Sequence, residues 1–144
     1  TVGGVGPKGS IKGAVGVAPP RWYTQVEISF TNAADLGIDP PLRESGDIEG
    51  SPGCTLIGTE GRKLTIDKGV VAALRHIHMH TKDAADFGVV AGQRVKIRVP
   101  GERGLVFDNV IVRVGDNLAL EMHIDMDEGR AACVVEFQLV ELIK

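Results

Sequence analysis

All four histidines of the chain lie in two short segments whose residue types could bind a metal ion. His76, His78 and His80 stand at every second position, and His123 follows in an alternating segment further along. A strand sends alternate side chains to opposite faces, so the first three imidazoles would share one face. Imidazole is a common ligand of Zn²⁺ and similar divalent ions. These segments are therefore candidates for a metal site.

An acidic residue stands in a comparable setting earlier in the chain. Glu27 lies between Val26 and Ile28, as His78 and His123 lie between apolar neighbours. Each of the three segments would bury its apolar residues and present its carboxylate or imidazole outward. We predict a metal site, with candidate ligands Glu27, His76, His78 and His123. The alternative is a structural role, because a lone histidine is more often structural than a metal ligand. His80 directly precedes an expected helix, and we expect it to contact solvent or to cap that helix.

Two arginines and a Gly/Ser-rich stretch could bind anions. Arg21 lies six residues before Glu27 and follows two prolines. Its guanidinium could be a fork for phosphate beside a metal, or it could be a surface side chain on a loop. Arg75, next to the first histidine, has the same two interpretations. The stretch that contains Ser45 and Gly46 could hold phosphates on backbone amides, although it lacks the P-loop pattern.

The elements that would position these residues recur along the chain. Residues 31–38 resemble residues 81–89, each with a threonine, central alanines and a glycine. We expect each threonine to cap a short helix that stops at Gly37 or Gly88. Residues 6–9, 58–61 and 101–104 are turn-forming tetrads with glycine at both ends. The repeating unit is therefore a turn, a strand pair, a ligand-bearing strand and a short helix.

The repeats divide the chain into three parts. We expect residues 1–30 to be the C-terminal portion of the first repeat ending, residues 31–80 a middle barrel unit with a short helix, and residues 81–144 a C-terminal barrel unit with a short helix. The first part has an ending without a beginning. We therefore expect the chain to be the C-terminal part of a longer protein, cut inside its first unit.

Composition favours a turn-rich β protein. The 144 residues include 19 glycines and only 4% aromatic residues. Together with the repeats, this predicts a mainly β fold of two small tandem β-barrels, each capped by a short α-helix, with the first barrel incomplete.

A net charge of −3 argues against nucleic acid or an anionic membrane as a partner. No apolar run is long enough to span a membrane, and we expect a cytoplasmic protein. Cys54 and Cys133 lie in apolar runs and are expected to be inert core residues.

Longer motifs carry a family resemblance along essentially the whole chain, in order. They are Thr24-Gln25-Val26-Glu27-Ile28-Ser29, Ser45-Gly46-Asp47, Gly50-Ser51-Pro52-Gly53, Arg75-His76-Ile77-His78-Met79, Gly101-Glu102-Arg103-Gly104-Leu105, Phe107-Asp108-Asn109-Val110 and Leu120-Glu121-Met122-His123-Ile124-Asp125. In these motifs the chain resembles the phosphate propanoyltransferase family of phosphotransacylases.

The resemblance implies an enzyme that converts a short-chain acyl-CoA, such as propanoyl- or acetyl-CoA, and phosphate to acyl phosphate and CoA. It implies two β-barrels with a pair of zinc ions at their junction. The family's metal ligands fall on Glu27, His76, His78 and His123, and its essential arginine falls on Arg21. The family has another His-x-His strand earlier in the chain. We expect this chain to hold one complete zinc site and the full-length protein to hold a second.

The resemblance also implies partners. Acyl-CoA and phosphate are the expected substrates, with Arg75, Ser45 and Gly46 as candidate substrate- or CoA-binding residues. We expect a homo-oligomer. Many family members work inside bacterial microcompartments, to which an N-terminal segment directs them, so the microcompartment lumen and its shell or cargo enzymes are a further expected location and set of partners.

Two other functions remain open. One is a zinc-dependent hydrolase of thioesters or acyl phosphates, in which a metal-bound water attacks. The other is a metal-stabilised, double-psi-like β-barrel that binds a partner without turnover. A hydrolase would release thiol without added phosphate, whereas a transferase would require phosphate.

Overall fold

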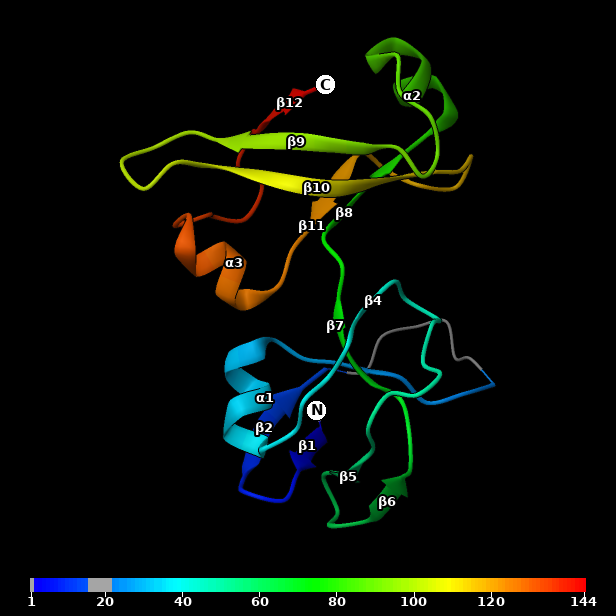
Figure 1. Ribbon diagram of the computed structural model, residues 1–144, viewed down its shortest axis with the longest axis vertical. Coiled ribbons are helices and arrows are strands. Elements are labelled where there is room, and N and C mark those ends of the chain that lie inside the picture. Colours follow the sequence, from blue (N-terminus) through cyan, green and yellow to red (C-terminus); the bar gives the residue numbers. More distant parts are fainter. Residues whose placement is uncertain (1, 16–21) are drawn as a thin grey trace. The chain divides into compact units, whose positions relative to one another are not determined.

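The computed structural model describes residues 2–15 and 22–144 (Figure 1). The chain divides into an N-terminal unit, Thr1–Ala73, and a C-terminal unit, Leu74–Lys144. Each unit has its own hydrophobic core and its own sheets. We describe the two units separately.

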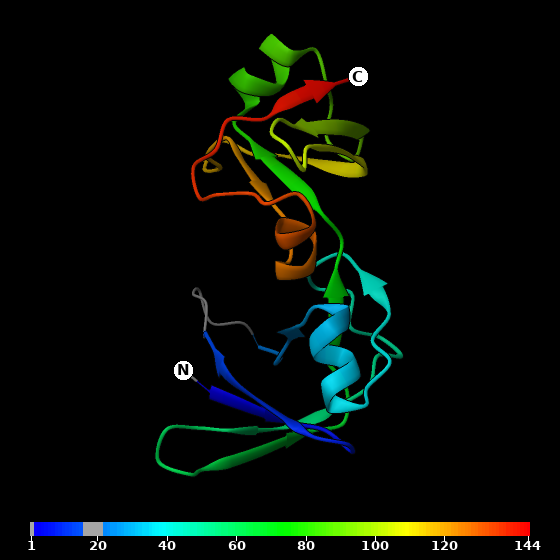
Figure 2. The same ribbon diagram turned by 90° about the vertical axis from the view of Figure 1, so that its left-hand side faces the viewer.

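The N-terminal unit contains a four-stranded sheet in the order β2-β1-β5-β6. Its strands are β1 (Val2–Val5), β2 (Ser10–Ala14), β5 (Cys54–Ile57) and β6 (Lys63–Ile66). Figure 2 shows that it consists of two hairpins side by side. A three-stranded sheet in the order β3-β7-β4 and one helix complete this unit within the described residues. These elements are β3 (Val26–Glu27), α1 (Phe30–Leu36), β4 (Leu42–Arg43) and β7 (Val70–Ala73).

The helix α1 closes the core of the N-terminal unit. Leu36 and Ala33 are buried on its inner face, where they join a cluster with Ile28, Cys54 and Val70. The helix stops because Gly37 adopts the left-handed conformation at φ 70°, which glycine reaches without steric cost. This places β3, with Glu27, directly before a packed helix.

The C-terminal unit is built on a five-stranded sheet in the order β11-β8-β10-β9-β12. Its elements are β8 (His76–Met79), α2 (Thr81–Phe87), β9 (Arg94–Val99), β10 (Leu105–Val114), β11 (Glu121–His123), α3 (Met126–Ala131) and β12 (Glu141–Ile143). The alternating strand β9 buries every second residue, and Val95, Ile97 and Val99 are at most 2% exposed. Ile77 and Met79 of β8 enter the same core. The opposite face of β8 therefore carries its histidines.

The mainly β fold is confirmed, as are the three glycine-flanked turns. These turns join β1 to β2, β5 to β6 and β9 to β10, and each is closed by a backbone hydrogen bond between its terminal glycines. The glycine stops after α1 and α2 are confirmed too. Barrel closure, the internal repeat and the division into residues 1–30, 31–80 and 81–144 stay predictions.

Two local expectations were wrong, and one helix was not expected. The cap of α1 is Ser29 and not Thr31, and of the two caps expected for α2, His80 is confirmed and Thr81 is not, because Ser29 and His80 have extended backbones and side chains that reach the amides of the first turn. The further helix, α3, begins at Met126, directly after its N-cap Asp125, which forms a capping box with Glu128. Cys133 is exposed and lies between α3 and β12, in a segment that is neither helix nor strand, whereas Cys54 is buried as expected. In residues 2–15 and 22–144, no helix is long and apolar enough to cross a membrane.

Candidate metal centre

Three histidines of the C-terminal unit converge on the outer face of its sheet. His76 and His123 are directly paired across the antiparallel strands β8 and β11, and His78 lies two residues along β8. The rings of His76 and His123 stack with centroids 4.9 Å apart and planes 6° apart, and the ring of His78 lies 4.4 Å from that of His123. One nitrogen of each ring lies within 4.8 Å of the other two. The sheet register thus produces a cluster that could hold a metal ion.

Hydrogen bonding leaves ring nitrogens free for coordination. His76 Nδ1 lies 2.9 Å from the carbonyl oxygen of Leu74, to which it donates, so Nε2 keeps its lone pair. The Nε2 atom of His123 is buried and has no hydrogen-bond partner among the described residues; the nearest carboxylate, Glu121, lies 3.5 Å away. A buried unpaired nitrogen is costly unless it coordinates a ligand. The donor set therefore fits a divalent metal ion.

Burial and nearby positive charge lower the pKa of two of these rings. Burial lowers the pKa of His76, and the positive charge of Arg113 and the other two imidazoles lower it further, against the opposing hydrogen bond to Leu74. Burial also lowers the pKa of His78, with further lowering from His123 and Arg113. Because metal ions bind the neutral imidazole, these shifts reduce competition from protons.

Sequence reasoning missed two charged residues on this face. Arg113 of β10 pairs with His78 on one side, and Glu121 of β11 pairs with it on the other. Directly paired residues project from the same face of a sheet. The alternation of β10 could have identified Arg113, since its neighbours Val112 and Val114 contribute to the core side. The histidines thus lie between a cation and an anion.

Arg75 has partners on the helix α3 and on the neighbouring strand β10. Its Nε lies 2.7 Å from Oε1 of Glu128 on α3, and its Nη1 donates to the carbonyl oxygen of Asp108 on β10 over 3.2 Å. The guanidinium carbon also lies 5.2 Å from the ring centroid of Phe107. The side chains of Arg75 and Glu128 are only 32% and 18% exposed. These contacts tie the start of β8 to β10 and α3.

Glu27 belongs to a polar cluster in the N-terminal unit. Gln25 donates from Nε2 to Oε1 of Glu27 over 2.7 Å and to Oγ of Ser45 over 3.0 Å. The backbone N–H of Gly46 donates to Oε1 of Gln25 over 2.7 Å. The structure therefore brings three predicted site residues together around Gln25. Sequence reasoning placed Gln25 in the ligand strand but gave it no role.

The remaining predicted residues differ in outcome. Arg21 lies outside the described residues, and its role stays a prediction. His80 caps α2, as expected: its Nδ1 accepts from the N–H of Lys82 over 3.1 Å, and Asp83 accepts from the N–H of His80 over 3.2 Å. His80 therefore caps a helix, whereas the other three histidines form the cluster that could hold a metal ion.

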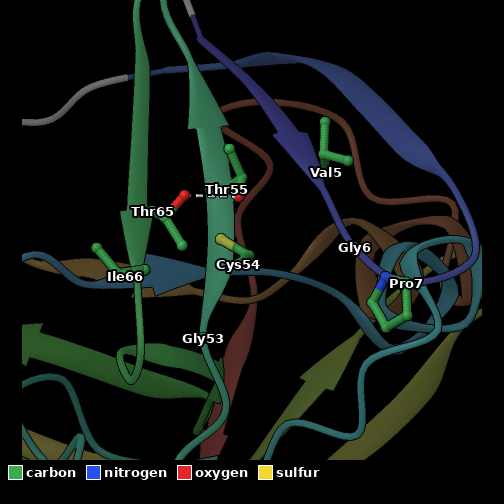
Figure 3. Close-up of a pocket in the computed structure, with 8 residues that line it drawn as sticks. All are labelled: Val5, Gly6, Pro7, Gly53, Cys54, Thr55, Thr65 and Ile66. Atoms are coloured by element: carbon green, nitrogen blue, oxygen red, sulfur yellow. Dashed lines mark hydrogen bonds between the residues drawn. The ribbon is translucent and has the colours of Figure 1, made fainter.

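A pocket of 350 Å³ in the N-terminal unit is not a candidate reaction site (Figure 3). Val5, Pro7 and Ile66 form much of its lining, and the hydroxyls of Thr55 and Thr65 are paired with each other over 3.0 Å. Its thiol, Cys54, has a pKa raised by burial, which disfavours the reactive thiolate. The pocket lacks the acid–base and metal-binding groups that the histidine face provides.

Comparison with known proteins identifies close relatives. The family model described as phosphate propanoyltransferase matches residues 1–135. A phosphate propanoyltransferase of Thermotoga maritima is 49% identical over 145 residues, covering 100% of this chain and 69% of the relative. One of Alkaliphilus metalliredigens is 49% identical over 128 residues, covering 89% and 60%, and one of Rhodopseudomonas palustris is 45% identical over 139 residues, covering 96% and 61%. The chain thus spans between 60% and 69% of the length of these relatives.

Proposed function

Because the chain belongs to the phosphate propanoyltransferase family, we propose that it carries the metal-binding part of a phosphotransacylase. The reaction is the reversible conversion of a short-chain acyl-CoA, propanoyl- or acetyl-CoA, and phosphate to acyl phosphate and CoA. The observation that carries this proposal is the cluster of His76, His78 and His123 in a chain so similar to relatives of that name. CoA and phosphate are the corresponding substrates.

Zinc is the proposed metal. Three imidazoles with a further position for a carboxylate or an exchangeable ligand are typical of zinc sites. We propose Glu27 as the fourth protein ligand, supported by its place before α1, which matches the place of His78 before α2. The hydrogen bond from Gln25 would orient its carboxylate, as outer-sphere partners do in metal sites. The resemblance also supports a second zinc ion and closed barrels.

Acyl transfer forms a C–O bond between a phosphate oxygen and the thioester carbonyl carbon and breaks the C–S bond. CoA leaves with the electron pair of that bond as a thiolate. A bound zinc ion would supply Lewis-acid polarisation of an oxygen in this reaction. The reaction needs no covalent protein nucleophile, so the buried Cys54 is not required.

We propose that polar and charged residues bind the substrates and orient the Glu27 carboxylate. Arg21 would hold phosphate through the two parallel hydrogen bonds of its guanidinium. The positive charge of Arg113, whose strand position is beside His78, favours the approach of anionic substrate to the histidine face. Ser45 and Gly46 would support the carboxylate of Glu27 through Gln25. A homo-oligomer and a place in a bacterial microcompartment stay predictions from the resemblance.

A thiol-release assay tests the proposed activity. Acetyl- and propanoyl-CoA are supplied with or without phosphate and with or without a chelator, to this chain and to the longer Thermotoga maritima relative. We expect phosphate-dependent thiol release that the chelator abolishes. Equal release without phosphate would contradict transfer and favour the hydrolase. Release by the relative but not by this chain would show that these 144 residues do not suffice.

A further inference from the structure

Two residues beside the histidine cluster have no place in the proposed chemistry but join the strands that form it. Arg75 directly precedes His76 on β8, and Glu128 lies on α3, five residues after His123. Their ion pair, 2.7 Å between Nε and Oε1, spans 53 residues of sequence. It lies at the end of the β8–β11 ladder where His76 and His123 are paired.

Both carboxylate oxygens of Glu128 form bonds that hold the chain where it leaves the end of β11. While Oε1 binds Arg75, Oε2 accepts from the N–H of Asp125 over 3.0 Å. Asp125 in turn accepts from the N–H of Glu128 over 2.9 Å and caps α3. Because Asp125 stands two residues after His123, this capping box sets the direction in which the chain leaves the ligand strand.

Arg75 connects the segment after β11 to β10, the strand on the other side of β8. Its Nη1 bonds to the carbonyl oxygen of Asp108, which lies at the irregularity of β10 where Asn109 has φ 56°. Its backbone carbonyl accepts from the N–H of Ile111, the residue paired with His76 on β10. A guanidinium can bind two acceptors in fixed directions, which an ammonium cannot do in the same way.

We propose that Arg75 and Glu128 are positioning residues, which hold the ends of β8, β10 and β11 in the arrangement that presents His76 and His123 to one metal ion. The pair acts through the backbone beside each ligand and does not itself touch the metal. This role rests on the proposed metal site, and it differs from the substrate contact expected for Arg75 from sequence.

The test measures zinc affinity of the 144-residue chain by competition with a chromophoric chelator. We expect Arg75→Gln and Glu128→Gln each to raise the zinc dissociation constant about 10-fold, the lower end of the effect of losing a partner bonded directly to a ligand, because this pair acts through the backbone. The double variant should lose little more than either single variant, because the two residues act as one unit. Arg75→Lys should lie between wild type and Arg75→Gln. Glu128→Gln keeps an acceptor for Asp125, so α3 should persist.

Lys96→Gln is the matched control. It removes one positive charge from the same sheet, and its ion pair with Asp108 is long, at 3.6 Å, with side chains 53% and 61% exposed. An exposed pair of this kind contributes little, so zinc affinity should stay within about twofold of wild type.

A second readout needs no metal. Diethyl pyrocarbonate acylates accessible neutral imidazoles, and mass spectrometry gives the rate at each histidine. His76 is only 8% exposed, so we expect faster acylation in Arg75→Gln and Glu128→Gln, with His80 as an unchanged internal reference. Folded variants with wild-type zinc affinity and wild-type acylation of His76 would overturn the proposal. If wild type binds no zinc, the acylation rates decide the positioning role alone, and absence of phosphate-dependent thiol release counts only against the proposed activity.

Discussion

Two strands of this molecule carry a pair of potential functional side chains just before a helix, and they hold them differently. In the N-terminal unit Gln25 directly precedes β3 and Glu27 ends it, whereas in the C-terminal unit His76 and His78 both lie on β8. β8 has a strand on each side, β10 and β11, whose register places the third histidine. β3 is two residues long and pairs only with β7 among the described residues.

The two units orient these side chains by different means. In the C-terminal unit the backbone ladder aligns the imidazoles, so their positions follow from strand pairing. In the N-terminal unit a side-chain network through Gln25 holds Glu27 and connects it to Ser45 and Gly46. We therefore expect the affinity for a metal ion to depend chiefly on the histidines of β8 and β11. We expect the orientation of the Glu27 carboxylate to depend on the side-chain amide of Gln25.

Loss of a histidine ligand should have the largest effect. His76→Ala and His123→Ala each remove one of three converging nitrogens, so the zinc dissociation constant should rise by more than the roughly 10–100-fold that loss of an outer-sphere partner costs. Isothermal titration calorimetry measures this. His80→Asn, which keeps a capping side chain on the same strand end, should bind zinc as wild type does. Equal zinc affinity in His76→Ala and His80→Asn would contradict the assignment of His76 as a metal ligand and His80 as a helix cap.

The polar network of the N-terminal unit should have a moderate effect on stability. Gln25→Leu removes hydrogen bonds to Glu27, Ser45 and Gly46, one of them to a carboxylate. We expect the free energy of unfolding to fall by about 1–3 kcal/mol, as measured by urea denaturation. Gln25→Glu should be no better, because it loses both donors and places a second carboxylate beside Glu27. A Gln25→Leu variant as stable as wild type would show that the network does not hold β3.

The two helix caps should have smaller and similar effects. Ser29→Ala and His80→Ala each leave an N–H in the first helical turn without its side-chain acceptor, that of Asn32 or of Lys82. The cost is about 0.5–2 kcal/mol for each. Thermal unfolding measures both, and Ser29→Asn and His80→Asn should restore most of the loss. A cost at only one of the two sites would break the parallel between the helices.

Acidification should destabilise the histidine strand of the metal-free chain by a small amount. Burial lowers the pKa values of His76 and His78 in the folded state, so the unfolded chain takes up protons first as the pH falls through about 6.5. The free energy of unfolding should therefore decrease between about pH 7 and 5.5. Urea denaturation with chelator present tests this. The decrease should be smaller in His76→Asn; an unchanged or opposite slope in that variant would contradict the assignment.

Sequence patterns predicted what depends on near neighbours. Alternation placed His76 and His78 on one face because a strand has a period of two. The stops at Gly37 and Gly88 followed from the left-handed conformation that glycine favours. The role of His80 as a helix cap was also predictable, since it directly precedes the helix-like segment.

Patterns did not predict what depends on distant pairing or on a fine choice between neighbours. Ser29 was missed as a cap in favour of the threonine two positions later, because both types can cap and only the backbone decides. The pair of Arg75 and Glu128 is 53 residues apart, and no local signal connects them. The pairing of Arg113 with His78 likewise required the parallel register of β10 and β8.

The most direct measurement of the central claim is X-ray absorption spectroscopy of the zinc-loaded 144-residue chain, with a His76→Ala/His78→Ala/His123→Ala variant as its control. We predict one ion for each chain, with scattering from three imidazoles at about 2.0–2.1 Å and an oxygen ligand as well. The triple variant should retain no stoichiometric zinc. A zinc shell without imidazoles, or equal zinc retention by the triple variant, would contradict the account.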